Sequence, residues 1–280
     1  MEQPQPLAGE TKHTIAILAC TIAWRDKLLD HAVSAARKIG FDGLEVWGRE
    51  PHTPDKFDET RLRAARKMIE LSGLKVAVLS SYLRFGMTRN DSSAVQIGDT
   101  LHIAHSLKTP VVRVWASDVA SRAATPAVWK QTISEARVAA EHAAKLEITL
   151  VMEMHPGTLA DTAQSALKMI HEVDHPAFRI NYQVNSFNDG QSPEERLEMV
   201  LPWVRHMHAQ NYDQLTLHDL DAPRRVPLAS GIANYPRLIG ILRQAGYQGS
   251  ISVEFAYDES VKGKQVALED DLRFLRALCQ

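Results

Sequence analysis

Short apolar runs alternate with longer amphipathic stretches along this chain, and the alternation occurs eight times. The short runs are rich in β-branched and aliphatic residues, as buried strands are, whereas the longer stretches carry apolar residues at helical spacing. The predicted strands cover residues 14–20, 43–47, 74–80, 110–115, 148–153, 179–183, 204–210 and 250–255. The predicted helices lie between these strands, and three examples cover residues 28–40, 59–73 and 126–146.

Several predicted helices carry sequence signals at their ends. Gly40, Gly73 and Gly246 each follow an amphipathic stretch, where helices commonly end in a left-handed residue that favours glycine. Ser192 and Glu195 are spaced as a capping box at the start of the sixth helix, in which each side chain binds the backbone N–H of the other.

Strict alternation of strands and helices predicts a parallel sheet, because each helix returns the chain to the same end of the sheet. Eight such units favour a closed (β/α)8 barrel, the TIM-barrel fold, over an open sheet. Residues 20–26, after the first strand, lack the GxGxxG fingerprint of a dinucleotide-binding fold. No linker divides the chain, so we predict a polar N-terminal tail over residues 1–12 and one barrel domain over residues 13–280.

The composition narrows the range of partners. A formal net charge of -2 gives neither the basic surface typical of nucleic-acid binding nor a polybasic membrane-binding segment. No apolar run reaches the length of a membrane span, and the N-terminus does not resemble a signal peptide. Cys20 and Cys279 lie at opposite ends of the chain and predict no disulfide framework. We expect a cytoplasmic protein without nucleic-acid or membrane partners, whose barrel can form homo-oligomers through its outer helices.

Four polar residues at the C-terminal ends of predicted strands form the main candidate site. They are Glu153, Gln183, His208 and Glu254, and TIM barrels build their active sites at this end. Buried carboxylates and imidazoles are costly unless they are paired or bound to a cation. Two carboxylates, an imidazole and an amide oxygen suit one divalent cation, Mn²⁺, Mg²⁺, Co²⁺ or Zn²⁺. The alternative is that these side chains only hydrogen-bond one another across the barrel mouth.

The same residues carry a resemblance to a known family. The chain has E-x-H at residues 153–155, a polar residue at 183, H-x-H at 206–208 and EF at 254–255. In this order they resemble the xylose isomerase-like barrel superfamily, which includes ketose 3-epimerases, hydroxypyruvate isomerases, inosose dehydratases and endonuclease IV. Residues 41–50, 111–118 and 227–255 strengthen the resemblance, which covers nearly the whole chain and implies a sugar isomerase or epimerase.

The resemblance implies roles for individual residues. Glu153 and Glu254 match the metal-binding glutamates that move protons in the epimerases, and His208 matches the imidazole ligand. Gln183 stands where the epimerases usually have Asp, and Ser186 stands where they have His, with Asn185 as a substitute contact. Because an amide removes one negative charge from the ligand set, we expect weaker metal affinity and a stronger Lewis acid.

Endonuclease activity is not expected, because the further ligands of endonuclease IV are missing. Its three-metal site needs histidines from the third and fourth strands, where this chain has Ser80, Ser81 and Arg113. It also needs an Asp-x-His after the seventh strand, where residues 222–228 read APRRVPL.

Seven further residues near the strand ends are predicted to contact the substrate: Glu45, Trp47, Arg113, Trp115, His155, Asn185 and Arg224. Arg113 suits a carboxylate, a phosphate or a hydroxyl group, and its alternative role is a salt bridge to Glu45 or Glu153. The two tryptophans suit a sugar ring, or packing at the rim. Arg224 either closes on the substrate or is a solvated charge.

The predicted reaction is proton transfer beside the carbonyl group of a small polyhydroxylated substrate, through an enediolate, giving isomerisation or epimerisation. Glu153 and Glu254 are the predicted proton carriers. If a leaving group lies next to the carbanion, the same first step leads to elimination. A dehydratase or lyase acting on a keto-sugar, keto-inositol or keto-glycoside is therefore the alternative. A metal-free barrel that acts as a binding or scaffold subunit is the second alternative, and Gln183 favours it.

Overall fold

Eight parallel strands close into a barrel in the computed structural model, which describes residues 14–88, 96–185, 190–215, 223–257 and 263–280. Around the barrel the strands follow the order β1-β10-β7-β6-β5-β4-β3-β2, so the first and last barrel strands of the chain lie side by side. They are β1 (Ala16–Cys20), β2 (Gly43–Trp47), β3 (Val76–Phe85), β4 (Val111–Ala116), β5 (Thr149–Glu153), β6 (Phe178–Gln183), β7 (Val204–Ala209) and β10 (Ser250–Val253). The predicted (β/α)8 barrel is confirmed.

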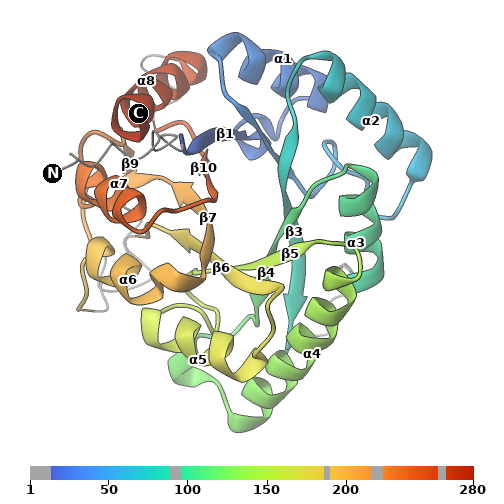
Figure 1. Ribbon diagram of the computed structural model, residues 1–280, viewed down its shortest axis with the longest axis vertical. Coiled ribbons are helices and arrows are strands. Elements are labelled where there is room, and N and C mark those ends of the chain that lie inside the picture. The colour runs from blue at the N-terminus through green and yellow to red at the C-terminus, as the bar shows by residue number, and fades with distance from the viewer. Residues whose placement is uncertain (1–13, 89–95, 186–189, 216–222, 258–262) are drawn as a thin grey trace, which may run out of the picture.

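Eight α-helices of the described residues surround the barrel as an outer ring (Figure 1). They are α1 (Leu29–Ile39), α2 (Glu59–Leu71), α3 (Ile97–Ser106), α4 (Pro126–Ala144), α5 (Ala163–Val173), α6 (Pro193–Val200), α7 (Tyr235–Gln244) and α8 (Lys264–Cys279). Short 3-10 helices cover Thr21–Trp24, Ser121–Ala123 and Leu201–Trp203. Helix α8 contacts α1 beside the β1–β10 junction, so the helical ring closes where the sheet closes.

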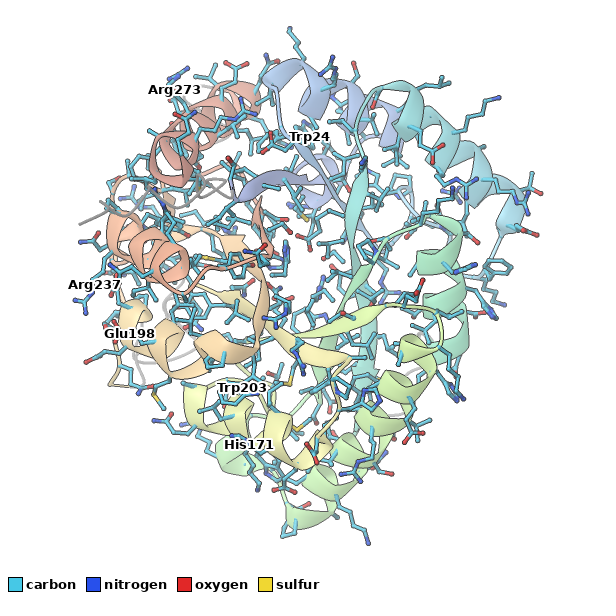
Figure 2. All side chains as sticks on the ribbon, in the orientation of Figure 1. Trp24, His171, Glu198, Trp203, Arg237 and Arg273 are labelled. Carbon is cyan, nitrogen blue, oxygen red and sulfur yellow. The ribbon has the colours of Figure 1, made fainter. Side chains whose placement is uncertain are left out.

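The main core lies between the strands and the helical ring. The inner face of the C-terminal half of α4 consists of alanines, and Ala136, Ala139, Ala140 and Ala143 are fully buried, so this part of the helix can lie close to the sheet. Side chains also fill the space inside the ring of strands (Figure 2), as is typical of a TIM barrel. The barrel interior is therefore packed, and polar groups at its C-terminal end are largely removed from water.

The predicted helix ends are confirmed. Gly40, Gly73 and Gly246 have φ values of 99°, 80° and 64°, in the left-handed region where glycine avoids the strain of a Cβ atom. The Ser192 side chain accepts a hydrogen bond from the Glu195 backbone, and the Glu195 side chain accepts one from the Ser192 backbone. The capping box therefore opens α6.

The strand boundaries differ from the prediction in two places that matter for the site. β3 continues to Phe85, and its register against β4 shifts between Ser80 and Arg84. Two short strands, β8 (Asn211–Tyr212) and β9 (Arg225–Val226), form an antiparallel pair that was not predicted. Both features place extra side chains near the barrel mouth.

The N-terminal tail, the two cysteines and the histidines of α3 are not among the predicted site residues. The predicted tail, residues 1–12, lies outside the described residues. Cys20 and Cys279 are buried free cysteines. His102 and His105 lie exposed on α3, away from the strand ends. Among the described residues, no helix combines the length and the apolar character that crossing a bilayer requires.

Candidate metal and active site

Four neighbouring strands bring the predicted metal ligands to one end of the barrel. Glu153 and Gln183 are the last residues of β5 and β6, His208 precedes the last residue of β7, and Glu254 directly follows β10. These strands are adjacent in the order β5-β6-β7-β10, and the pairing register sets Gln183 opposite His208. Because the strands are parallel, their C-terminal ends meet at the barrel mouth.

The donor atoms of these side chains converge. Gln183 Oε1 lies 2.8 Å from His208 Nδ1, and Glu254 Oε1 lies 3.7 Å from the same nitrogen. One ligand atom from each of Glu153, His208 and Glu254 falls within 4.8 Å of the others. All four side chains are buried. Two carboxylates, an imidazole and an amide oxygen in one buried place suit a divalent cation.

The short contact between His208 Nδ1 and Gln183 Oε1 requires either a hydrogen atom on Nδ1 or a cation that binds both atoms. Burial alone disfavours a charged His208, but the carboxylates of Glu45 and Glu254 outweigh it and raise the pKa of His208 to about 9. At neutral pH the metal-free ring is therefore an imidazolium, and its Nδ1–H donates to Gln183 Oε1. A metal ion must displace this proton to bind Nδ1.

In the metal-free chain, the carboxyl group of Glu254 has a pKa near neutral pH. Burial raises its pKa to about 7; the charge of His208 opposes the rise, and the Glu153 carboxylate adds to it. A carboxylic acid with a pKa near neutrality can both accept and donate a proton under physiological conditions. This property suits the proton-carrier role predicted for Glu254.

Glu153 has a different partner, the buried Arg113 of β4. Arg113 Nε lies 3.1 Å from Glu153 Oε2, and Nε–H and Nη2–H donate to Ser80 Oγ at 3.1 and 2.7 Å. Burial disfavours the guanidinium charge, but Glu153 outweighs it and raises the pKa of Arg113. Arg113 Nη1 has no hydrogen-bond partner among the described residues although it is buried. The arginine thus makes the alternative salt bridge and still has a donor for a ligand.

Arg113 is also part of what we call the cation–aromatic wall, which consists of Arg49, Tyr82, Arg84, Arg113 and Trp115. The Tyr82 ring centroid lies 4.6 Å from Arg49 Cζ and 5.1 Å from Arg113 Cζ. The Trp115 centroid lies 4.6 Å from Arg84 Cζ and 4.8 Å from Arg113 Cζ. The two rings stack at 6.4 Å with an interplanar angle of 19°. The wall therefore holds guanidinium groups and flat rings in a fixed array.

Three predicted substrate contacts lie beside this wall or beside the metal ligands. Trp47 Nε1–H donates to the Tyr82 hydroxyl oxygen at 2.9 Å. The His155 ring lies 4.7 Å from the Trp115 ring, and its Nδ1–H donates to the Pro156 carbonyl oxygen at 2.7 Å. Asn185 is buried just beyond β6. Their roles in substrate binding stay predictions.

The other two predicted contacts have partners within the protein. The fully buried Glu45 accepts hydrogen bonds from His206 and His208, each at 2.9 Å. Burial opposes the charge of Glu45, but His208 and His206 outweigh it and hold its pKa well below the usual range. The Arg224 side chain is 84% exposed and pairs with Asp213 at 3.0 Å, as a solvated charge does.

Three residues near the site, Arg225, Tyr82 and Arg84, are not among the predicted substrate contacts. Arg225, next to Arg224, lies with its guanidinium 3.8 Å from the Phe255 ring centroid because the short β8–β9 pair positions it. Tyr82 and Arg84 lie in the extension of β3. The apolar-polar alternation of residues 81–85 could have revealed that extension, whereas no local signal identifies the β8–β9 pair.

Comparisons with known proteins place this geometry in context. A sequence profile described as "Xylose isomerase-like TIM barrel" matches residues 33–278. The 3-dehydroshikimate dehydratase of Bacillus anthracis is 26% identical over 249 residues, which cover 83% of this chain and 88% of that protein. The L-ribulose-5-phosphate 3-epimerase UlaE of Escherichia coli is 22% identical over 233 residues, which cover 78% and 79%.

A solved structure shares the fold over almost the whole length. The xylose isomerase-like TIM barrel protein of Mycobacterium smegmatis, in complex with magnesium, superposes with a TM-score of 0.73 at 20% identity. The match covers 97% of this chain and 98% of that one. The chain is therefore similar to a dehydratase, to an epimerase and to a magnesium-bound barrel.

Proposed function

The chain belongs to the xylose isomerase-like TIM barrel family, and on that premise we propose that it is a divalent-metal-dependent enzyme acting on a small polyhydroxylated carbonyl compound. The observation that carries the proposal is the convergence of Glu153, His208 and Glu254 within 4.8 Å. Three buried ionisable groups at the C-terminal end of a TIM barrel are costly in a purely structural role.

Glu153, Gln183, His208 and Glu254 hold the cation in this proposal, which covers Mn²⁺, Mg²⁺, Co²⁺ and Zn²⁺. When bound, the cation polarises the substrate carbonyl group and makes the neighbouring C–H more acidic. The magnesium in the Mycobacterium smegmatis structure supports a divalent cation. Gln183 in place of a carboxylate lowers the negative charge of the ligand set and so weakens binding.

We propose that loss of water follows removal of the proton. Glu153, which faces the Arg113 guanidinium, takes the proton from the carbon beside the carbonyl group. Glu254, which follows β10 on the other side of the site, gives a proton to the departing hydroxyl group, which leaves as water while a carbon–carbon double bond forms. Two carboxyl groups in such different surroundings suit different roles, one base and one acid. The 26% identity to a dehydratase supports this reaction.

The cation–aromatic wall suits the recognition of an anionic or flat part of the substrate. Arg113 Nη1, a buried donor without a hydrogen-bond partner among the described residues, suits a carboxylate or phosphate oxygen. The names of the two relatives denote a carboxylated and a phosphorylated substrate, which supports an anionic substrate here.

Epimerisation is the second candidate function. Glu153 ends β5 and Glu254 directly follows β10. These strands are separated by β6 and β7, so the two carboxyl groups approach a bound substrate from two directions. This arrangement suits removal of a proton by one carboxylate and its return by the other, and the similarity to an epimerase supports it. A metal-free binding subunit is the third candidate. It is supported by Gln183, which stands where the epimerases usually have a carboxylate ligand.

Product analysis distinguishes these candidates. The Mn²⁺-loaded chain is incubated in D₂O with 3-dehydroshikimate and, separately, with L-ribulose 5-phosphate, and the products are analysed by mass spectrometry and ultraviolet absorption. We expect a product that has lost one water and gained conjugation. Recovery of substrate skeletons that carry one deuterium instead indicates epimerisation.

Glu254→Gln serves as the inactive control in these reactions. The metal content of the chain is measured after purification without chelator. Less than about a tenth of an equivalent of metal, together with no rise in melting temperature on adding Mn²⁺, would exclude both enzyme candidates.

A further inference from the structure

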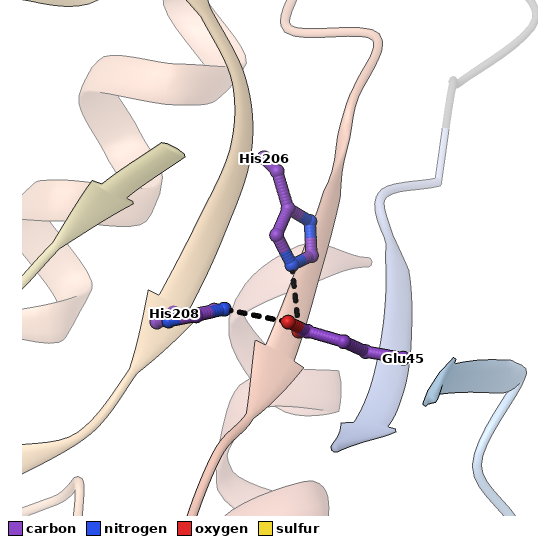
Figure 3. A group of neighbouring side chains, drawn as sticks. All are labelled: Glu45, His206 and His208. Atoms are coloured by element: carbon purple, nitrogen blue, oxygen red, sulfur yellow. Dashed lines mark hydrogen bonds and ion pairs between the residues drawn. The ribbon is translucent and has the colours of Figure 1, made fainter. Parts of the chain in front are cut away.

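Glu45 reaches across the barrel interior to two histidines of one strand. Glu45 belongs to β2, whereas His206 and His208 belong to β7, and β1 and β10 lie between these strands in the barrel. In Figure 3 the two imidazole rings approach the Glu45 carboxylate from different sides. All three side chains are completely buried. The contact therefore links β2 to β7 through His208, which is itself a candidate metal ligand.

Each oxygen of the Glu45 carboxylate contacts one imidazole nitrogen. Oε1 lies 2.9 Å from His208 Nε2, and Oε2 lies 2.9 Å from His206 Nε2. An ionised carboxylate can only accept hydrogen bonds, so both Nε2 atoms must carry the hydrogen. The Asn181 amide also lies 3.1 Å from His208 Nε2, and its oxygen, which has no other partner among the described residues, is the amide atom that suits this N–H. In His208 this leaves Nδ1, the atom that faces Gln183 and Glu254, as the nitrogen that can offer a lone pair.

His206 has a bracing role in this arrangement. Its Nδ1 lies 3.0 Å from Ser250 Oγ, and its Nε2 lies 3.1 Å from Ser252 Oγ. The two hydroxyl groups of β10 thus fix the His206 ring, and that ring fixes the second oxygen of Glu45. The His206 and His208 rings are nearly perpendicular, at 89°, so the carboxylate is restrained in two directions.

Glu45, His206 and His208 also meet the distance requirement for a metal site of their own, since their ligand atoms lie within 4.8 Å of one another. However, His208 belongs to both groups and contributes Nε2 to one and Nδ1 to the other. A neutral imidazole has one lone pair available and one N–H. Two cations held at once would require His208 to lose both protons, so a neutral His208 serves only one of the two sites.

We propose that Glu45 is a positioning residue that holds the Nε2–H of His208 and directs Nδ1 towards a single metal ion, with His206 as its brace. This inference rests on the proposed metal-dependent function. Hydrogen bonds of this kind fix the tautomer and ring orientation of a metal-binding histidine and raise its basicity. The three-residue cluster is therefore a hydrogen-bonded support for the metal site and holds no second ion.

The first test measures the tautomer in the wild-type chain. Histidines are labelled with ¹⁵N, the chain is loaded with diamagnetic Zn²⁺, and long-range ¹H–¹⁵N correlations are recorded. We expect His208 to carry its proton on Nε2 and the metal on Nδ1, with one ion per chain. A proton on Nδ1, or two bound ions per chain, would overturn the positioning role.

The second test compares variants by Mn²⁺ titration and by the visible spectrum of the Co²⁺-loaded chain. Glu45→Gln should weaken Mn²⁺ binding by about tenfold to a hundredfold and shift the Co²⁺ bands. His206→Asn keeps the Glu45–His208 hydrogen bond and should therefore weaken Mn²⁺ binding less than Glu45→Gln does. It replaces Glu45→Gln in this test if that variant does not fold.

The matched control is Glu194→Gln, the same substitution at another buried glutamate. Glu194 Oε1 accepts a hydrogen bond from the Asn234 backbone at 2.8 Å, in a region separate from the metal ligands, so Mn²⁺ affinity should stay at the wild-type value. Wild-type affinity in a folded Glu45→Gln chain would overturn the positioning role alone. Absence of metal from the wild-type chain would overturn the proposed function, and this inference with it.

Discussion

The two halves of the barrel mouth carry different chemistry. The half formed by β5, β6, β7 and β10, here called the metal half, contributes carboxylate, amide and imidazole groups. The opposite half, here called the substrate half, contributes the guanidinium groups and rings of the cation–aromatic wall. Buried contacts join the halves, among them Arg113 to Glu153 at 3.1 Å and Glu45 to His206 and His208, each at 2.9 Å.

This difference separates two tasks within one fold. Oxygen and imidazole donors suit a cation, whereas arginines and aromatic rings suit an anionic or flat part of a substrate. Changes in the metal half should therefore affect turnover and metal binding. Changes in the cation–aromatic wall of the substrate half should affect the Michaelis constant and the choice of substrate.

The largest effect is expected from Glu254→Gln in the metal half. Loss of a group that transfers a proton should lower kcat by about a thousandfold, while circular dichroism and melting temperature show an intact fold. The control is again Glu194→Gln, which should retain kcat. A folded Glu254→Gln chain with kcat within about threefold of the wild type would show that Glu254 does not carry the proton.

A smaller kinetic effect, with a large cost in stability, is expected from Arg113→Gln. The Michaelis constant for an anionic substrate should rise by about tenfold to a hundredfold. Because Glu153 loses its buried partner, the free energy of unfolding should fall by about 3 to 5 kcal/mol. Arg61→Gln, at the exposed pair with Glu50, is the matched control and should cost less than about 1 kcal/mol in urea denaturation.

Trp115→Leu tests the ring component of the substrate half. It removes the face that lies 4.6 Å from Arg84 and 4.8 Å from Arg113. We expect the Michaelis constant to rise by about threefold to tenfold, because stacking of the indole ring on a flat part of the substrate contributes about 1 kcal/mol, with kcat little changed. A fall in kcat at constant Michaelis constant, measured by steady-state kinetics, would contradict the division of tasks between the halves.

Asp271 belongs to neither half, so its replacement should change stability and leave kcat unchanged. Its Oδ1 accepts a hydrogen bond from the Leu228 backbone at 2.9 Å, just beyond the β8–β9 pair. Burial raises its pKa from an ordinary 3.8 to about 7; the Leu228 hydrogen bond opposes the rise, and Asp270 adds to it. The folded chain therefore binds this proton more tightly than the unfolded chain, and the resulting stability is lost as pH rises from about 4 to 7.

Asp271→Asn cannot ionise, so its free energy of unfolding should match that of the wild type near pH 4 and exceed it by about 4 kcal/mol at pH 8. Thermal denaturation at the two pH values measures the difference. Equal stability of the two proteins at pH 8 would show that Asp271 ionises without cost.

The sequence predicts the metal half better than the substrate half, for a physical reason. Glu153, Gln183 and Glu254 interrupt apolar runs whose ends mark one edge of a parallel barrel, so strand pattern and fold class together bring them to one place. In the substrate half, β3 shifts register between Ser80 and Arg84. The simple run predicted for that strand therefore ended before Tyr82 and Arg84.

Contacts across the barrel interior cannot be predicted from the local sequence pattern. Glu45 and His208 are separated by 163 positions in the chain, and only the closed barrel brings them together. Arg225 likewise depends on the two-residue pairing of β8 with β9. Sequence alone does not distinguish the surroundings of Arg224 and Arg225, because the two arginines are adjacent and only the strand pairing orients them.

The central claim is that the metal half holds one divalent cation, and anomalous diffraction from Mn²⁺-soaked crystals tests it most directly. We predict a single anomalous peak per chain, within about 2.0 to 2.6 Å of His208 Nδ1, Gln183 Oε1 and the carboxylates of Glu153 and Glu254. A peak on the Nε2 side of His208, or no peak in crystals soaked at saturating Mn²⁺, would contradict the claim.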